Sequence, residues 1–225
     1  QLVTVALGGI IFDWDGVVIN SARLHEESWE LLANELGLTL PDNHFKAGFG
    51  KRNEIIIPDI LKWTEDREKI SHWGKRKEIL YRNLGRSKGI PILDGVRDLL
   101  QSLKHFGFPC AIGTSTEKKN LELAFEQLHL ASFFSGMICS EDVKQGKPNP
   151  EVFIKAAQII SQEPENCVVL EDSTHGIEAA KRGGMKALGL STTRSSEELL
   201  DCGADLVVES PKSINISLLK SLFMN

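Results

Sequence analysis

Two aspartates near the start of the chain, Asp13 and Asp15, have the type and spacing needed for catalysis. They follow an apolar run, Leu2 to Phe12, that is too short to span a bilayer and apolar enough to form a strand buried on both faces. Carboxylates at the carboxyl end of a parallel strand lie where open α/β sheets bind ligands. Asp13 could therefore attack phosphorus while Asp15 acts as acid and base. Taken alone, the pair could equally cap a turn at Gly16.

A second segment could hold a phosphate. The apolar run 108–113 stops at Thr114, Ser115 and Thr116, whose hydroxyl and N–H groups precede a predicted helix. Such groups at the start of a helix bind anions. Thr114 by itself is more often a helix cap than a ligand.

A cation and two further acids follow. Lys147 stands next to Pro148, which stiffens its loop, and a fixed cation is what a phosphoryl-transfer site requires. The short apolar run 166–170 ends at Glu171 and Asp172, and adjacent carboxylates suit a hard cation such as Mg²⁺. A lone loop lysine is usually a solvated charge, and the two acids could also cap a helix. The combination of all these strand ends favours a phosphoryl-transfer site.

The same residues resemble a known family. In identity, order and approximate spacing they match the four motifs of the haloacid dehalogenase superfamily, and segments 12–25, 146–153 and 170–179 are similar to its β-phosphoglucomutase and phosphoglycolate phosphatase branch. The resemblance covers almost the whole chain. It implies an aspartyl phosphate formed on the first aspartate, hydrolysis of a small phosphorylated metabolite such as a sugar phosphate, and Mg²⁺ as cofactor. The metal ligands that it implies are Asp13, the backbone carbonyl of Asp15, and Glu171 and Asp172 directly or through water.

The resemblance also points to residues outside the four motifs. His25, Gly48, Lys51, Lys77 and Thr116 fall at or near positions that bind substrate or align the acid/base in the mutase. On sequence alone His25 could be a polar residue on an amphipathic helix, and Lys77 could be part of a basic helix face. The mutase has arginine where the simplest alignment puts Lys51, with Arg52 as a nearby substitute. Lysine lacks the planar two-pronged grip on a second phosphate. This difference favours a phosphatase over a phosphosugar mutase, which stays the alternative.

The pattern along the chain divides it into two parts. Helical apolar spacing from Ser21 stops at Gly37, and further helical stretches are predicted over 53–63, 64–73 and 75–84. From residue 90 the pattern alternates, with a helix over 95–105, strands near 108, 136, 166, 185 and 205, and helices between them, which predicts a parallel sheet. We therefore expect an α/β fold: a Rossmann-like core with helices on both faces (1–18 and 90–225) and an inserted all-helical cap domain (19–89).

Composition agrees with a globular enzyme. The 225 residues are 41% hydrophobic and 25% charged, and the net charge of −5 comes from interspersed acids and bases, which predicts neither a nucleic-acid nor a membrane partner. The four cysteines (Cys110, Cys139, Cys167 and Cys202) lack metal-ligand spacing and predict reduced thiols in a cytoplasmic protein. We expect a monomer or weak dimer.

Other classes fit less well. A haloacid dehalogenase proper and a phosphonatase both lack the second aspartate, so Asp15 argues against them. A response-regulator receiver also carries a phospho-aspartate, but it is about half this length and has no helical insertion. A degenerate binding protein would be expected to have lost at least one motif residue, and all are present.

Overall fold

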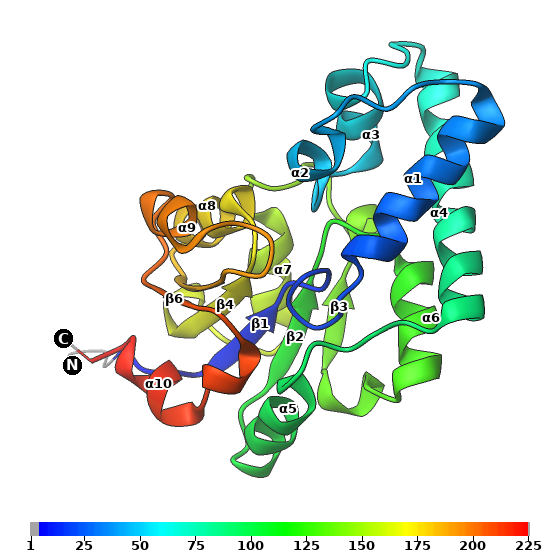
Figure 1. Ribbon diagram of the computed structural model, residues 1–225. Helices are drawn as coiled ribbons and strands as arrows, with labels where there is room; N and C mark the ends of the chain where they lie inside the picture. Colours follow the sequence, from blue (N-terminus) through cyan, green and yellow to red (C-terminus); the bar gives the residue numbers. More distant parts are fainter. Residues whose placement is uncertain (1–4, 225) are drawn as a thin grey trace.

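A single parallel sheet positions the candidate residues. The computed structural model describes residues 5–224, and its strands run in the order β3-β2-β1-β4-β5-β6, all parallel (Figure 1). The α/β prediction is confirmed, with β1 in the interior of the sheet. The strands are β1 (Gly9–Phe12), β2 (Cys110–Gly113), β3 (Gly136–Ile138), β4 (Cys167–Glu171), β5 (Lys186–Leu190) and β6 (Leu206–Val208).

The first strand is shorter than the apolar run Leu2 to Phe12 that predicted it. β1 begins at Gly9, and residues 2–4 lie outside the described residues. The neighbouring strands explain this start, because Gly9 pairs with the first residue of β4 and Ile10 with the first residue of β2. Gly8 instead donates its N–H to the carbonyl of Asn166, in the turn before β4, at 2.7 Å.

Helices cover both faces because successive strand residues point to opposite sides. In β1, Ile10 and Phe12 pack in a core cluster with α5, α6 and α10, whereas Ile11 packs with α7, α8 and α9 on the other face. The core helices are α5 (Val96–His105), α6 (Lys118–Leu128), α7 (Glu151–Ile159), α8 (Thr174–Arg182), α9 (Ser196–Asp201) and α10 (Ile216–Ser221), with 3₁₀ turns at Ala131–Phe133, Ser140–Asp142, Pro164–Asn166 and Pro211–Ser213.

The helices between β1 and α5 lie above the carboxyl ends of the strands (Figure 1). The two predicted helical stretches 64–73 and 75–84 are one helix, which begins after Asp66, whose carboxylate caps the N–H groups of Glu68 and Lys69. Gly74 does not interrupt it and packs against Asn53. The elements are α1 (Ala22–Leu36), α2 (His44–Gly48), α3 (Asn53–Ile55), a π-helical turn (Ile56–Ile60) and α4 (Arg67–Lys88).

This helical segment has a hydrophobic cluster of its own, which includes Trp29, Leu32, Ile57 and Leu80, with Trp63 and Trp73 packed at its edge. We therefore propose that residues 19–89 form a cap domain on a core made of the rest of the chain, and we use these two names below. Support comes from the connections, because Ile19 and Ile92 form an antiparallel bridge where the chain leaves and re-enters the core.

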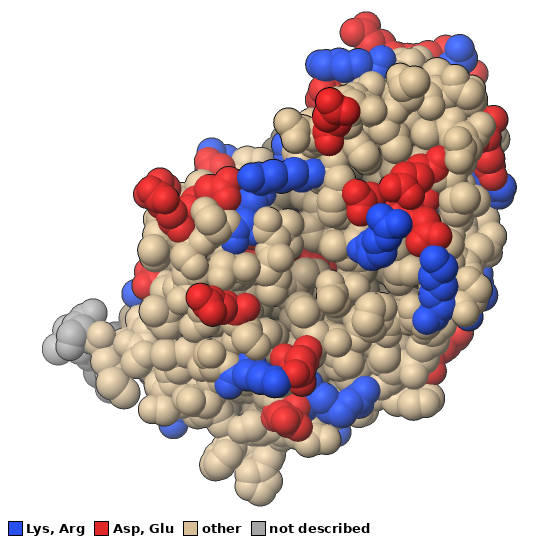
Figure 2. Space-filling model, in the orientation of Figure 1, with Lys and Arg blue, Asp and Glu red and all other residues tan. Residues whose placement is uncertain are grey.

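Acidic and basic side chains are interspersed on the face of the molecule that Figure 2 shows, and neither charge dominates it. Within residues 5–224, every helix is too short or too polar to cross a membrane.

Two isoleucines test whether burial in the cap cluster stabilises the protein. Ile57 is fully buried in it, whereas Ile55, two residues earlier, is 43% exposed. Replacing Ile57 with alanine should lower the free energy of unfolding by about 2–5 kcal/mol, because it leaves a cavity, while Ile55→Ala should cost less than about 1 kcal/mol. Urea unfolding followed by tryptophan fluorescence measures both, and equal losses would contradict the packing described here.

Candidate active site

The carboxyl ends of three neighbouring strands bring the predicted residues together. Asp13 follows β1, Thr114 follows β2 and Glu171 ends β4. Because β1 lies between β2 and β4 and is in register with both, these residues meet at one edge of the sheet. Lys147 reaches the same point from the loop between β3 and α7.

Lys147 is the cation at the centre of this edge. Its Nζ donates to Asp13 Oδ1 at 2.9 Å and to Glu171 Oε2 at 2.8 Å, and its side chain is 2% exposed. The ammonium also lies 4.8 Å from the centre of the Phe153 ring. Although burial opposes charge on a lysine, the two carboxylates raise the pKa of Lys147 above its usual range. It is therefore a fixed positive charge.

Three buried carboxylates lie close together here, and Lys147 contacts two of them. One oxygen each of Asp13, Glu171 and Asp172 lies within 4.8 Å of the others. Burial and the charge of Glu171 raise the pKa of Asp13 to about 8 despite Lys147, and burial and the neighbouring acids also raise the pKa of Asp172. Burial opposes ionisation of Glu171 as well, but Lys147 lowers its pKa to about 2. Fully ionised, the cluster has two negative charges in excess, which a divalent cation would neutralise.

The oxygens of the acids are not equally available. Glu171 Oε1 accepts from the N–H groups of Asp172 and Ser173 and from the Ser173 hydroxyl at 2.9–3.0 Å, while its Oε2 accepts from Lys147. Asp172 accepts from Thr193 Oγ1 through Oδ2. Asp13 and Asp172 are thus better placed to offer an oxygen directly to a metal, and Glu171 is better placed to act through water.

Two glycines allow the acids to come this close. A Cβ on Gly16 would lie 2.1 Å from Asp172 Oδ2, and Gly16 has a φ of +78° that side chains disfavour. A Cβ on Gly176 would lie 1.8 Å from Glu171 Oε2. Both positions therefore require glycine for the carboxylates to occupy their places.

Asp15 is held apart from the other acids by residues at the start of the cap. Its Oδ1 accepts from Ser21 Oγ at 2.5 Å and lies 2.8 Å from His25 Nε2. Burial opposes ionisation of this carboxyl, but the contacts with His25 and Ser21 lower the pKa of Asp15. The second aspartate is thus a buried carboxylate with its own hydrogen-bond partners.

The loop after β2 offers hydrogen-bond donors beside the acids. The hydroxyl oxygen of Thr114, which is buried, accepts from the N–H of Thr116 at 3.1 Å, so its proton can be donated elsewhere. Thr116 in turn accepts from Asn120 at 3.2 Å through its own hydroxyl oxygen. Ser115, between them, lines the cavity at the mouth of the site.

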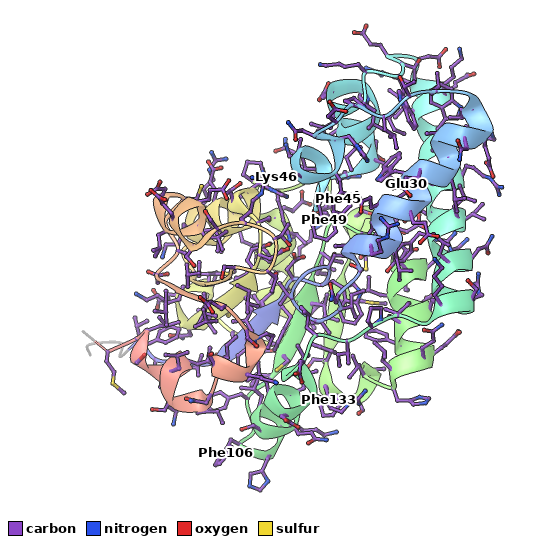
Figure 3. All side chains as sticks on the ribbon, viewed as in Figure 1. Glu30, Phe45, Lys46, Phe49, Phe106 and Phe133 are labelled. Atoms are coloured by element: carbon purple, nitrogen blue, oxygen red, sulfur yellow. The ribbon has the colours of Figure 1, made fainter. Side chains whose placement is uncertain are left out.

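A cavity of about 260 Å³ lies between the cap and these strand ends, and Asp13 and Asp15 form part of its lining. Figure 3 labels Phe45 and Phe49 of the cap near the opening between cap and core, and both residues line the cavity. The cap residues singled out from the sequence also line it: His25, Gly48, Lys51 and Lys77. The Lys77 ammonium already contacts His25 and Glu78, which leaves one of its three N–H groups for a substrate.

Several polar residues of the site were missed by the sequence reasoning. Ser21 holds Asp15 and Thr193 holds Asp172. Glu78 lies behind Lys77 and is bonded to Asn120. For Thr193 a signal was present, because it follows the end of β5. Glu78 and Asn120 sit on helices that are far apart in the sequence, and no spacing rule joins them.

The close approach at Gly16 gives a first test of the site. Gly16→Ala should displace Asp172 and reduce Mg²⁺ binding at least about tenfold, because a metal site depends on the placement of its carboxylates. Gly37→Ala is the matched control, since Gly37 also has positive φ but a Cβ there meets nothing within 4 Å. Titration calorimetry measures binding, and equal affinities in both variants would contradict the assignment.

The raised pKa of Asp13 gives a second test. Below about pH 8 the metal-free Asp13 holds a proton that a cation must displace, so Mg²⁺ affinity should rise from pH 6 to pH 8, by at most about tenfold per pH unit for this one proton and by less as the pH nears 8. The affinity rises with pH because the metal ligand is the deprotonated carboxylate of Asp13. Calorimetry in two buffers of different ionisation enthalpy would detect the released protons. An affinity that stays constant over this range would refute a site built on Asp13.

Comparisons with known proteins agree with this arrangement. A family model described as haloacid dehalogenase-like hydrolase matches residues 10–190. A chloroplastic 5-amino-6-(5-phospho-D-ribitylamino)uracil phosphatase of Arabidopsis thaliana is 34% identical over 95% of this chain, which spans 57% of that protein's length. A phosphorylated carbohydrates phosphatase of Thermotoga maritima is 26% identical over 92% of this chain and 96% of its own length.

A solved structure has the same fold. The HAD hydrolase, family IA, variant 3, from Entamoeba histolytica superposes with a TM-score of 0.88 at 28% identity, over 97% of this chain and 100% of that one. The family model covers more than half of the chain and includes the strand ends that carry all the acids of the site. The resemblance inferred from the motifs is therefore confirmed, and the chain belongs to the haloacid dehalogenase-like hydrolase family.

Proposed function

We propose that the protein is a Mg²⁺-dependent phosphatase that hydrolyses a small phosphorylated metabolite, a sugar phosphate or similar phosphomonoester, through an aspartyl phosphate on Asp13. The observation that carries the proposal is the buried bridge of Lys147 between Asp13 and Glu171, with Asp15 held two residues away on its own partners. This arrangement combines a nucleophile, a fixed cation and an acid/base at the mouth of one cavity.

In the first step Asp13 attacks the phosphoryl group in line with the leaving oxygen. Lys147 and the hydroxyl of Thr114 are placed to hold the equatorial oxygens as negative charge spreads over them. The repulsion between a carboxylate and one phosphate charge at 4 Å is about 4 kcal/mol at an effective dielectric of 20, so this positive charge is required.

Asp15 acts first as a general acid and then as a general base. As an acid it donates a proton to the leaving oxygen, and as a base it takes a proton from the water that hydrolyses the aspartyl phosphate. The contacts with Ser21 and His25 hold it ionised, which suits the base. For the acid step Asp15 must carry a proton, which its Oδ2 can hold while Oδ1 still accepts from His25.

The donor set fits Mg²⁺, because hard carboxylate oxygens with excess negative charge suit a small divalent cation. Asp13 and Asp172 would hold it together with the backbone carbonyl of Asp15, and Glu171 directly or through water. When bound, Mg²⁺ supplies further positive charge against the incoming phosphate.

The size of the cavity and the names of the relatives support a small substrate. A volume of about 260 Å³ suits a compact metabolite, and both relatives described above are named as phosphatases of small phosphorylated compounds. Ser115, Thr116, His25, Lys51 and Lys77 would contact the substrate or align the acid/base. A cytoplasmic location and a monomer or weak dimer stay predictions.

A β-phosphoglucomutase-type mutase is the second candidate, because it shares the aspartyl phosphate and differs in whether water or a returning sugar hydroxyl attacks it. Lys51, at the position where the simplest alignment with the mutase has arginine, lines the cavity, and so does Arg52 beside it. A lysine is a point charge and fixes a second phosphate less firmly than an arginine fork does. We therefore favour hydrolysis.

A phosphate-release screen tests the proposal. With Mg²⁺ and no bisphosphate activator, the protein should release inorganic phosphate from at least one sugar phosphate or similar monoester, and chelator should abolish the release. Asp13→Asn should show no phosphoryl adduct by mass spectrometry and lose more than about 10³-fold in kcat, because the nucleophile is gone.

Two results would contradict the proposal. Undiminished turnover in excess chelator would exclude the metal. The mutase would be favoured if β-glucose 1-phosphate were converted to glucose 6-phosphate with little release of inorganic phosphate, and only when a sugar bisphosphate is added.

A further inference from the structure

A buried carboxylate that the mechanism above does not use lies behind the acid/base. Glu78, on α4 of the cap, is 7% exposed. Its Oε1 accepts from Asn53 Nδ2 at 2.8 Å and from Lys77 Nζ at 3.1 Å, and its Oε2 accepts from Asn120 Nδ2 at 2.6 Å. Burial opposes its ionisation, but the Lys77 ammonium and these amides lower the pKa of Glu78. Glu78 is therefore a buried carboxylate whose oxygens are both hydrogen-bonded, and its contacts on either side indicate what it does.

On one side Glu78 connects to Asp15. Lys77 Nζ lies 2.7 Å from His25 Nδ1, and an ammonium can only donate, so Nδ1 accepts and Nε2 carries the ring proton. That proton points at Asp15 Oδ1, 2.8 Å away. Tyr81 stacks on the imidazole at 4.1 Å between ring centres and fixes its plane. The position of Lys77 therefore decides which proton His25 offers to Asp15.

On the other side Glu78 connects to the core. Asn120 lies on α6, and its amide also donates to Thr116 Oγ1 at 3.2 Å, in the loop that we propose holds phosphate. Arg82, one turn after Glu78 on α4, donates to Asn120 Oδ1 at 2.9 Å and pairs with Glu117. These contacts form only while α4 of the cap lies against α6 of the core.

We propose that Glu78 is a positioning residue that couples the docking of the cap to the orientation of Asp15, through Lys77 and His25 on one side and Asn120 on the other. The inference rests on the proposed phosphatase function, in which Asp15 is the acid/base. With the cap docked, Glu78 holds Lys77 against His25. With the cap lifted, Glu78 loses its bond to Asn120, and the restraint on Lys77 is weakened.

The test separates the two chemical steps. With p-nitrophenyl phosphate, whose leaving group needs no protonation, Glu78→Gln should keep the burst that reports formation of the aspartyl phosphate within about threefold. Hydrolysis of the intermediate, which needs Asp15 as base, should slow about 10- to 100-fold, which is no more than the roughly 10²- to 10⁴-fold that a general acid/base supplies in full. With an alkyl phosphate, which needs the acid, the burst itself should slow by a similar factor.

A second variant tests the coupling itself. Asn120→Ala removes the contact on the core side and touches neither Lys77 nor His25. If Glu78 transmits docking, this variant should also slow hydrolysis of the intermediate at least about fivefold at saturating substrate. Its effect should not add to that of Glu78→Gln, because both interrupt one chain of contacts. If Glu78→Gln does not fold, Asn120→Ala carries the test alone.

The matched control is Glu35→Gln, which removes the charge of the exposed pair of Glu35 with Arg76 between α1 and α4, the helices that carry His25 and Lys77, and should leave both rates unchanged. Normal hydrolysis of the intermediate in Glu78→Gln, or an Asn120→Ala variant that changes only KM, would overturn the inference while leaving the phosphatase intact. A wild-type protein without burst or phosphate release would instead overturn the proposed function.

Discussion

The site depends on one electrostatic constraint: three buried carboxylates lie close together, and one buried ammonium contacts only two of them. Each acid on its own would resist ionisation in such surroundings, and together they repel one another. Lys147 compensates for only part of this charge, through its bonds to Asp13 and Glu171. Burial and the charges of the neighbouring acids raise the pKa of Asp13 and of Asp172, and the close packing of the carboxylates leaves no room for a Cβ at Gly16 and Gly176.

Asp13 and Asp15 differ because their partners come from different parts of the chain. Asp13 belongs to the core and contacts Lys147 from the core, whereas Asp15 contacts Ser21 and His25, where the chain enters the cap. Residues two positions apart thus have opposite pKa shifts, one raised by burial among acids and the other lowered by its hydrogen-bond partners. Such a separation suits one group to attack phosphorus and the other to transfer protons.

Much of this could be predicted from the sequence because the chemistry sits at strand ends. An apolar run followed by a charged residue locates Asp13, Thr114 and Glu171 without knowledge of the fold, and parallel topology then places them together. The buried contacts of the cap were beyond such reasoning. Lys77 looks like a residue of a basic helix face, and only the packing of α4 against α1 and α6 shows that Glu78 and His25 enclose it. The start of β1 likewise depends on where its neighbours begin.

The paired connections of the cap have a consequence for how such proteins diversify. Because Ile19 and Ile92 lie side by side in an antiparallel bridge, the chain leaves the core and returns to it at one place. The intervening helices can therefore change in length or composition without altering the register of any strand in the sheet. Selection can act on the lining contributed by Phe45, Phe49 and Lys51 while the acids and Lys147 stay fixed, so new substrates can be acquired around an unchanged reaction.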